Sequence, residues 1–414
     1  MLIDKYMNLV FVNHMHPTTP HVSGMRSWFF ARELARRGHR VVQLCEWREG
    51  TEIAPPPTRL AQRLRAHDWA EPLLLAVRPL RRALLDRIRS TRTPVMLRKA
   101  LVTWSYLRHS GMFTDFSQAT QPYLTVLARE FQPQATWGLF GNTDCWLIAQ
   151  RLGRLAGCPW AADMKDSWEV FMPSTLQTII ARRFSDMAAS TANAEFNAQV
   201  LSRWFPSQPC VVYSGVDRSF ADAAPTRLDQ GVFRLTLTGS IYDHGSLEAF
   251  IDGLSEWLTK LTGVKPVGVE IVYAGGDHAI VRPALERLAG LARVEAHPYL
   301  PLPELAALCR SAAVNTYLWD PNCFHHKLLE LLACGRPVLA FPGETEESRG
   351  LAADTGGELF CCAASADLAE TLDLIRGRCP APAPHDVCSA SFTWAALAVR
   401  LERVFQQVTR QTRV

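Results

Sequence analysis

The sequence predicts an α/β protein of two doubly wound domains, each with a mainly parallel sheet between helices. Three observations support this fold class. At 414 residues the chain is long for one hydrophobic core and typical of two domains. Hydrophobic residues make up 48% of it, a globular level, and no apolar run approaches the roughly 18 residues that span a bilayer. Short apolar runs alternate with amphipathic helical segments in both halves of the chain.

The first domain opens with one strand–helix–strand unit. The pattern predicts a strand over 9–13, a polar loop over 14–24 with two prolines, and an amphipathic helix over 25–37. Gly38 ends that helix, and the next strand covers 41–44. This order is the βαβ unit from which parallel sheets are built.

Residues 57–110 differ from the rest of the first domain in charge. Twelve basic residues outnumber three acidic ones, and leucines, Trp69, Trp104 and Tyr106 are interleaved with them. We expect a basic helical insertion here, with two interpretations left open. The segment either docks on anionic lipid as an amphipathic surface, or forms a solvated helical insertion with core leucines.

The α/β pattern returns near residue 132 with a strand over 135–140 and a helix over 145–156. Residues 160–168 then form a strand end that leads into a loop, and a further strand is expected over 185–190. Chemistry in doubly wound folds sits beyond the carboxyl ends of strands, so polar residues of this loop are well placed for it. They are Asp163, Lys165, Asp166 and Trp168. A simple loop with a helix-capping Asp is the alternative.

The second domain repeats the alternation of strands and helices after a boundary near Asp217. A helix is expected over 303–308 and a last one from 395 to about 410. The expected strands cover 233–241, 269–274, 294–296, 313–318 and 338–341.

Lys327 and Glu330 carry the candidate chemistry of the second domain. They lie three apart and so share one helix face. Gly335 ends this helix and Pro337 leads into the buried strand. A lysine near a helix start can meet a diphosphate, and the glutamate can accept hydrogen bonds from ribose hydroxyls. On spacing alone, an ordinary surface ion pair is the better interpretation.

The sequence of residues 324–337 resembles the donor-sugar motif of family 4 glycosyltransferases, F-x-x-K-x-x-E-x-x-A-x-G-x-P. The resemblance implies a GT-B fold, in which two Rossmann-like domains face each other across a cleft, and a nucleotide-sugar donor. It implies donor contacts from Phe324, Lys327 and Glu330. Many members have a second Glu eight positions before the first, where this chain has Asn322.

Gly239 and Ser240 resemble the family's turn at the donor diphosphate. An Arg or Lys usually follows within a few residues to bind that diphosphate, whereas this chain has Asp243 and His244 there. The resemblance therefore implies donor contacts from Gly239, Ser240 and His244. Because the usual second cation is missing, Lys327 would have to neutralise more of the negative charge of the diphosphate.

The first domain shares further family patterns. Ser23-Gly24 and residues 34–41 resemble the small-Gly pair and L-A-x-x-L-x-x-x-G-H-x-V of the family, and residues 163–168 resemble its D-x-R-D-x-W signature near the acceptor. The resemblance implies that Asp163 and Asp166 orient hydroxyls or polarise the reacting site. His14, His16 and His21 lie on the first loop, where one could meet the acceptor beside Ser23, Gly24 and Trp168. For each histidine alone, a structural or exposed role is more common.

The resemblance also bears on the domain limits. Residues 211–217 resemble the family's I-x-N-G-V-D turn, and 391–394 its S-x-x-W before a helix that crosses back. We therefore expect a first domain over 1–217 that includes the insertion and receives the helix at 395–410, and a donor domain over 218–394.

Several functional classes lack their signatures. Eleven cysteines include no C-x-x-C pair, so neither a zinc site nor a disulfide framework is indicated. No G-x-G-x-x-G, G-x-x-x-x-G-K-[ST], H-E-x-x-H or G-x-S-x-G motif is present. A net charge of +4 is too small to suggest nucleic acid. The N-terminus has no signal-peptide layout, which favours the cytoplasm.

The expected function is sugar transfer from a nucleotide-diphosphate sugar, as substrate, to the hydroxyl of a sugar or lipid-linked acceptor. Family resemblance implies a retaining, metal-independent enzyme without a cofactor, in cell-surface polysaccharide or glycolipid synthesis. If the basic segment docks on lipid, it would place the protein at the inner face of the plasma membrane; otherwise the cytoplasm is expected. Two alternatives stay open, a GT-B sugar-nucleotide epimerase and an inactive GT-B binding subunit. The sequence identifies neither the sugar nor the acceptor.

Overall fold

The chain contains two α/β units, each with its own parallel sheet. The computed structural model describes residues 6–79, 83–221, 231–261, 268–321, 324, 326–378 and 389–411. One unit comprises Met1–Tyr213 and Leu397–Val414, and the other Ser214–Ala396. Their sheets have seven and six strands. The expected architecture of two doubly wound domains is confirmed. The two units divide between Tyr213 and Ser214.

The sheet of the first unit is parallel throughout, in the order β3-β2-β1-β4-β5-β6-β7. Its inner strands are runs of apolar residues because helices cover both faces. The strands are β1 (Asn8–Val12), β2 (Arg40–Glu46), β3 (Leu73–Val77), β4 (Ala135–Leu139), β5 (Trp160–Met164), β6 (Ala189–Ala192) and β7 (Pro209–Val211). The strand expected over 185–190 begins later, at Ala189, because Met187 and the residues before it form a turn.

The helices of the first unit include the C-terminal helix of the chain. In α18 (Trp394–Gln411), the ring of Phe405 lies 5.8 Å from that of Phe11 on β1. The others are α1 (Val22–Arg36), α2 (Pro57–Ala66), α3 (Ala83–Arg89), α4 (Val95–His109), α5 (Thr114–Val126), the π-helical turn η1 (Leu127–Phe131), α6 (Thr143–Ala156), α7 (Trp168–Phe171), α8 (Ser174–Arg183) and α9 (Glu195–Trp204).

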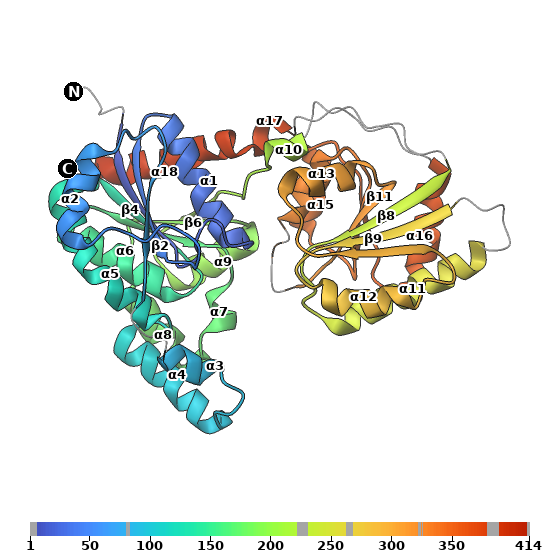
Figure 1. Ribbon diagram of the computed structural model, residues 1–414, viewed down its shortest axis with the longest axis horizontal. Helices are drawn as coiled ribbons and strands as arrows, with labels where there is room; N and C mark the ends of the chain where they lie inside the picture. Colours follow the sequence, from blue (N-terminus) through green and yellow to red (C-terminus); the bar gives the residue numbers. More distant parts are fainter. Residues whose placement is uncertain are drawn as a thin grey trace. The chain divides into compact units, whose positions relative to one another are not determined.

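The expectation of a helical insertion over 57–110 is wrong for its first half. The apolar run of β3 pairs in parallel with β2 and forms the edge of the sheet. Helix α2 buries Leu60 and Leu64 in the core of the unit, so it belongs to the α/β framework. Only α3 and α4 form a helical insertion, which stands away from the sheet (Figure 1).

The second unit has the strand order β10-β9-β8-β11-β12-β13, again parallel. Its strands are β8 (Val232–Thr238), β9 (Gly268–Ala274), β10 (Arg293–His297), β11 (Val314–Leu318), β12 (Val338–Phe341) and β13 (Leu359–Cys361). Its helices are α10 (Arg218–Ala221), α11 (His244–Leu261), α12 (His278–Glu286), α13 (Leu302–Arg310), α14 (Lys327–Ala333), α15 (Glu346–Asp354), α16 (Ser365–Arg378) and α17 (Ser389–Phe392).

Two motifs far apart in the sequence meet within the second unit. Val216 bridges Thr393, and its amide donates to the carbonyl of Phe392 at 2.8 Å. A Cβ on Gly215 would lie only 2.5 Å from the backbone nitrogen of Trp394, so this position has no room for a side chain. The Gly-Val-Asp turn therefore packs directly against the Ser-x-x-Trp motif.

No helix in the described ranges is long and apolar enough to cross a membrane.

Candidate functional site

The candidate donor site lies at the carboxyl edge of the second sheet, where the strand order reverses. From β8 the chain continues to β9 and β10 on one side and to β11 and β12 on the other. Crevices at such switch points are the usual ligand sites of open α/β sheets. Gly239 follows β8 and Lys327 follows β11, and a Cβ built on Gly239 would lie 3.9 Å from Cγ of Lys327. The structure therefore brings these two predicted residues together.

Gly239 belongs to a loop that is fixed by its neighbours. It has φ +101°, a left-handed conformation that favours glycine. The Tyr273 hydroxyl donates to the Gly239 carbonyl at 2.8 Å, and the amide of Asp277 donates to the same hydroxyl at 3.2 Å. The carboxylate of Asp277 in turn accepts from the amide of Ile241 at 2.9 Å. These bonds hold the turn after β8 in one shape.

Lys327 and Glu330 form a close ion pair in the first turn of α14. The Nζ–Oε2 distance is 2.6 Å, and the side chains are 21% and 2% exposed. Burial acts to lower the pKa of Lys327, but the Glu330 carboxylate outweighs it and raises the pKa above its usual value. The ammonium lies 5.9 Å from the centre of the Phe220 ring. This half-buried pair is not the ordinary surface pair that spacing alone favours.

The first turn of α11 carries no cation to hold a diphosphate. Ser240, in the loop before this helix, and His244, its first residue, are both exposed. The Asp243 carboxylate accepts from the amides of Gly245 and Ser246, at 3.2 and 2.7 Å. The hydroxyl and amide of Ser246 lead the hydrogen bonds that lower the pKa of the Asp243 carboxyl. The amides that could face a phosphate are thus capped by a carboxylate.

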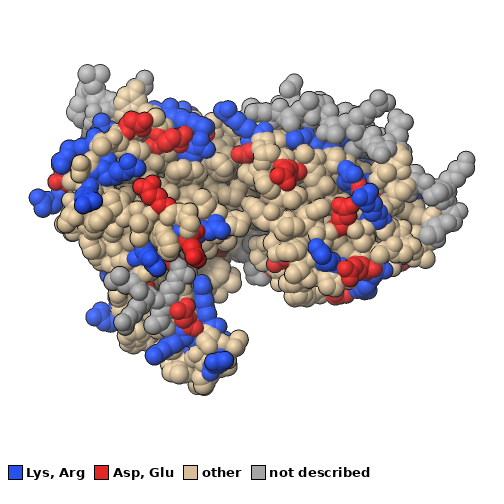
Figure 2. Space-filling model, viewed as in Figure 1, with Lys and Arg blue, Asp and Glu red and all other residues tan. Residues whose placement is uncertain are grey.

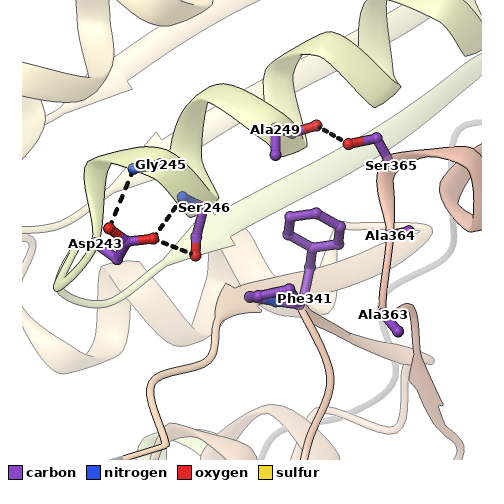
Figure 3. A pocket seen from close by; sticks show the side chains of 9 residues that line it. Asp243, Gly245, Ser246, Ala249, Phe341, Ala363, Ala364 and Ser365 are labelled. Carbon is purple, nitrogen blue, oxygen red and sulfur yellow. Dashed lines mark hydrogen bonds between the residues drawn. The ribbon is translucent and has the colours of Figure 1, made fainter.

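A hollow of about 320 Å³ has Asp243 among the residues that line it. Figure 3 shows their side chains. Its walls come from the start of α11, the end of β12 and the residues before α16. The lining residues are mostly small and apolar. The hydroxyl of Ser365 donates a hydrogen bond to the carbonyl of Ala249 at 2.7 Å, so it is already engaged. Neither Gly239 nor Lys327 lines it, so the hollow is separate from the ion pair.

Among the other predicted donor contacts, Phe324 is half-buried just before α14. Asn322 lies outside the described residues. Within those residues, no cluster of three or more His, Cys, Asp or Glu side chains could hold a metal ion.

The first unit has a polar cluster at its own switch point, between β1 and β4. The imidazole of His14 stacks on Phe113, with ring centres 4.5 Å apart, and the Arg89 guanidinium lies 5.7 Å from that ring. Burial, followed by the charges of His21, Arg89 and Lys165, lowers the pKa of His14 to about 3. His14 is therefore neutral near pH 7, and since its ring is buried, its role as an acceptor contact stays a prediction.

Lys165 and Asp166 lie close enough to influence His14 and His21. Their side chains pair at 2.7 Å and remain 12% and 28% exposed. The amide side chain of Asn197 holds the Lys165 carbonyl at 2.8 Å, which fixes the loop after β5. Both oxygens of the partly exposed Asp166 carboxylate accept from the Lys165 ammonium, at 2.7 and 2.8 Å, and its role toward a hydroxyl group stays a prediction.

Asp163 has different surroundings. Its carboxylate accepts from Nε and Nη2 of Arg26 at 3.0 and 2.7 Å and from the Thr191 hydroxyl at 2.7 Å. Both members of the ion pair are 0% exposed. The guanidinium also lies over the rings of Phe30 and Trp137. The geometry favours a positioning role for Asp163, which fixes α1 to β5, and its role as a catalytic group stays a prediction.

The other predicted acceptor contacts pack inside the unit. Trp168 is fully buried among aromatic rings, 5.2 Å from Phe205, so its ring offers an acceptor no surface. The Ser23 hydroxyl bonds to Asn13 at 3.2 Å. A Cβ on Gly24 would meet the His16 carbonyl at 2.8 Å, so this glycine allows a close approach of the chain's own loop. His16 is buried, and burial lowers its pKa.

Sequence reasoning missed Arg26, Arg89, Phe113, Tyr273 and Asp277. Arg26 could have been found from the sequence, because it lies four residues before Phe30 on the apolar face of α1. A charged side chain on that face needs a counter-ion. The others reach their sites through long-range contacts without a local pattern.

Comparison with known proteins shows the fold. No family model matches the chain, and no curated protein matches it. Solved structures do, over nearly all of both chains. Sucrose-phosphate synthase from Thermosynechococcus elongatus matches with 12% identity and a TM-score of 0.67, over 98% of this chain and 100% of that one. A glycosyltransferase from Rickettsia africae matches with 10% identity and a TM-score of 0.62, over 98% and 99%.

UDP-GlcNAc 2-epimerase from Neisseria meningitidis, bound to UDP-GlcNAc, matches with 14% identity and a TM-score of 0.52, over 97% and 100%. At these identities the likeness shows the fold alone. The chain has the GT-B fold, as its motifs led us to expect.

Proposed function

We propose that this chain transfers a sugar from a nucleotide-diphosphate sugar to a hydroxyl group of an acceptor. The observation that carries the proposal is the pairing of Lys327 with Glu330 beside the Gly239 turn, at the switch point of the second sheet. Proteins of the same fold include a glycosyltransferase and an epimerase bound to UDP-GlcNAc, which supports a nucleotide sugar as ligand.

Negative charge grows on the leaving diphosphate as the bond to the sugar breaks. The Lys327 ammonium, kept protonated by Glu330, would stabilise that charge in a setting of low dielectric. Glu330 would at the same time accept hydrogen bonds from the nucleotide. Because Asp243 caps the amides at the start of α11, they would not stabilise the diphosphate. Lys327 would therefore contribute more of the charge stabilisation than a lysine in a site with a second cation.

The acceptor would bind at the first unit, where the cluster of His14, Arg89, Lys165 and Asp166 offers both donors and acceptors. Asp166 would orient the attacking hydroxyl, since its carboxylate is partly exposed. We further expect retention at the sugar carbon without a metal or cofactor, and a product in cell-surface polysaccharide or glycolipid.

Two alternatives keep specific support. An epimerase is supported by the shared fold of the enzyme bound to UDP-GlcNAc. An inactive binding subunit is supported by Asp243 and His244, which stand where a cation for the diphosphate is usual.

The test is mass spectrometry of the wild type with a panel of nucleotide sugars and hydroxyl acceptors. Lys327→Met should reduce turnover by about 100-fold or more, because it removes a charge that acts on the transition state. Lys260→Met is the matched control, since Lys260 pairs with Glu256 at 2.8 Å but is 60% exposed on α11. A sugar found on the acceptor supports transfer, an epimerised donor supports the epimerase, and an unchanged donor supports the binding subunit. Equal rates for the two lysine variants would contradict the site.

A further inference from the structure

Helix α4 packs on the first unit through one face, where Tyr106 joins the hydrophobic core and Val102 packs against it. Its buried face carries Ser105 and Tyr106, which are 0% and 1% exposed. Tyr106 accepts a hydrogen bond from Asn142 at 3.0 Å, and the Ser105 hydroxyl donates to the carbonyl of Gly111. These polar contacts, with packing against α3 and α8, fix the orientation of α4 on the first unit.

The outward face of α4 is apolar. Met96, Ala100, Trp104 and Leu107 follow one another at helical spacing and so lie in one stripe. Met96 is 78% exposed, Trp104 51% and Leu107 47%. Val95 and Leu97, beside the start of the stripe, are 61% and 51% exposed. Scattered exposed apolar side chains are ordinary, whereas a continuous stripe of them marks an interaction surface.

Positive charge borders the stripe. A helix turns about 100° per residue, which places exposed Lys99 along one border and exposed Arg108 along the other. Residues 83–109 contain six basic residues and one acidic residue. Figure 2 shows Lys and Arg side chains on this part of the molecule, formed by α3 and α4. A second copy of the same surface would be repelled by this charge.

We propose that α4 docks the first unit on an anionic phospholipid bilayer. The apolar stripe would enter the boundary between headgroups and acyl chains, with the bordering cations at the level of the phosphates. Trp104 suits that depth, because tryptophan favours the membrane–water interface. The inference rests on α4 alone and does not depend on the proposed transfer. For a lipid-linked acceptor it would have a consequence, since Arg89 of α3 ties the same insertion to the polar cluster through Phe113.

Co-sedimentation with vesicles tests the proposal without any sugar substrate. The wild-type chain should bind phosphatidylcholine vesicles that contain phosphatidylglycerol, bind pure phosphatidylcholine weakly, and lose affinity as salt rises. The variant Met96→Ser/Trp104→Ser/Leu107→Ser should lower the affinity about tenfold or more, because it removes the buried apolar area. Lys99→Gln/Arg108→Gln should lower it about fivefold per charge.

Matched controls show whether a loss of vesicle binding is specific to α4 or follows from changing any exposed apolar or basic side chain. Leu155→Ser changes a leucine of α6 that is 56% exposed, and Arg59→Gln/Arg63→Gln changes two exposed arginines of α2. Both should bind vesicles like the wild type. All variants should unfold at the wild-type temperature, because the changed side chains lie on the surface.

Three results would overturn the proposal. The first is no binding to anionic vesicles at low salt. The second is binding that survives loss of the apolar stripe, or that falls equally in the α2 control. The third is a wild-type dimer in light scattering that the stripe variant converts to a monomer, without vesicle binding by either.

Discussion

Replacing Asp163 by Asn should destabilise the first unit rather than act on catalysis directly. The change leaves the Arg26 guanidinium charged and fully buried without its counter-ion, while the Thr191 hydroxyl can still donate to the Asn oxygen. Removing one partner of a buried pair costs about 3–5 kcal/mol. For a unit of this size the melting temperature should fall by about 6–20 °C.

Denaturant unfolding of the first unit measures this cost, and a double-mutant cycle assigns it. Adding Arg26→Met to Asp163→Asn removes the stranded charge and should recover part of the loss. Glu130→Gln is the matched control, because Glu130 pairs with Arg65 at 3.2 Å while their side chains are 36% and 73% exposed. Breaking that exposed pair should cost about 0–1 kcal/mol. Wild-type stability of Asp163→Asn, with transfer abolished, would refute the reasoning and restore Asp163 as a catalytic group.

Three further predictions follow from individual contacts. Because burial holds the pKa of His14 near 3 against an ordinary 6.5, the unfolded chain binds the proton first, so stability should fall by about 1.4 kcal/mol per pH unit below 6.5. His14→Gln should flatten that fall in urea titrations at several pH values. Gly275→Ala should weaken nucleotide binding in calorimetry, since its Cβ would lie 2.3 Å from the Tyr273 hydroxyl, whereas Gly276→Ala meets nothing within 4 Å and should bind normally. Asp243→Ala should tighten binding of a nucleoside diphosphate, because it frees the amides of Gly245 and Ser246 at the start of α11; unchanged affinity would show that the phosphates do not reach this turn.

The sequence predicted those parts of the fold that depend on local pattern. Strands β1, β4, β8, β9, β11 and β12 lie where apolar runs end in glycine or polar loops. Strand β3 escaped prediction, because its five apolar residues sit within a basic segment whose composition suggested helices. This segment forms a strand because it pairs with β2. Pairing between segments that a long loop separates leaves no local signal in the sequence.

In the candidate sites too, residues joined by a local pattern could be predicted, whereas contacts made only by tertiary packing could not. Lys327 and Glu330 could be predicted, because both lie on one helical turn within a long motif. Gly239 and Lys327 lie close together because β8 and β11 are neighbours in the sheet, and no local sequence pattern reveals that order of strands. The burial of Asp163 could not be predicted, because Arg26 lies 137 residues away in the sequence and meets it only when α1 packs on the sheet. The burial of Trp168 likewise depends on α9 and the residue after it.

The most direct test of the donor site is a crystal structure with a nucleoside diphosphate, chosen by calorimetry from UDP, GDP and ADP. We predict a diphosphate within hydrogen-bond distance of Nζ of Lys327 and over the turn at Gly239, with the ribose hydroxyls facing Glu330. A diphosphate bound in the hollow beside Asp243, or anywhere remote from Lys327, would contradict the account.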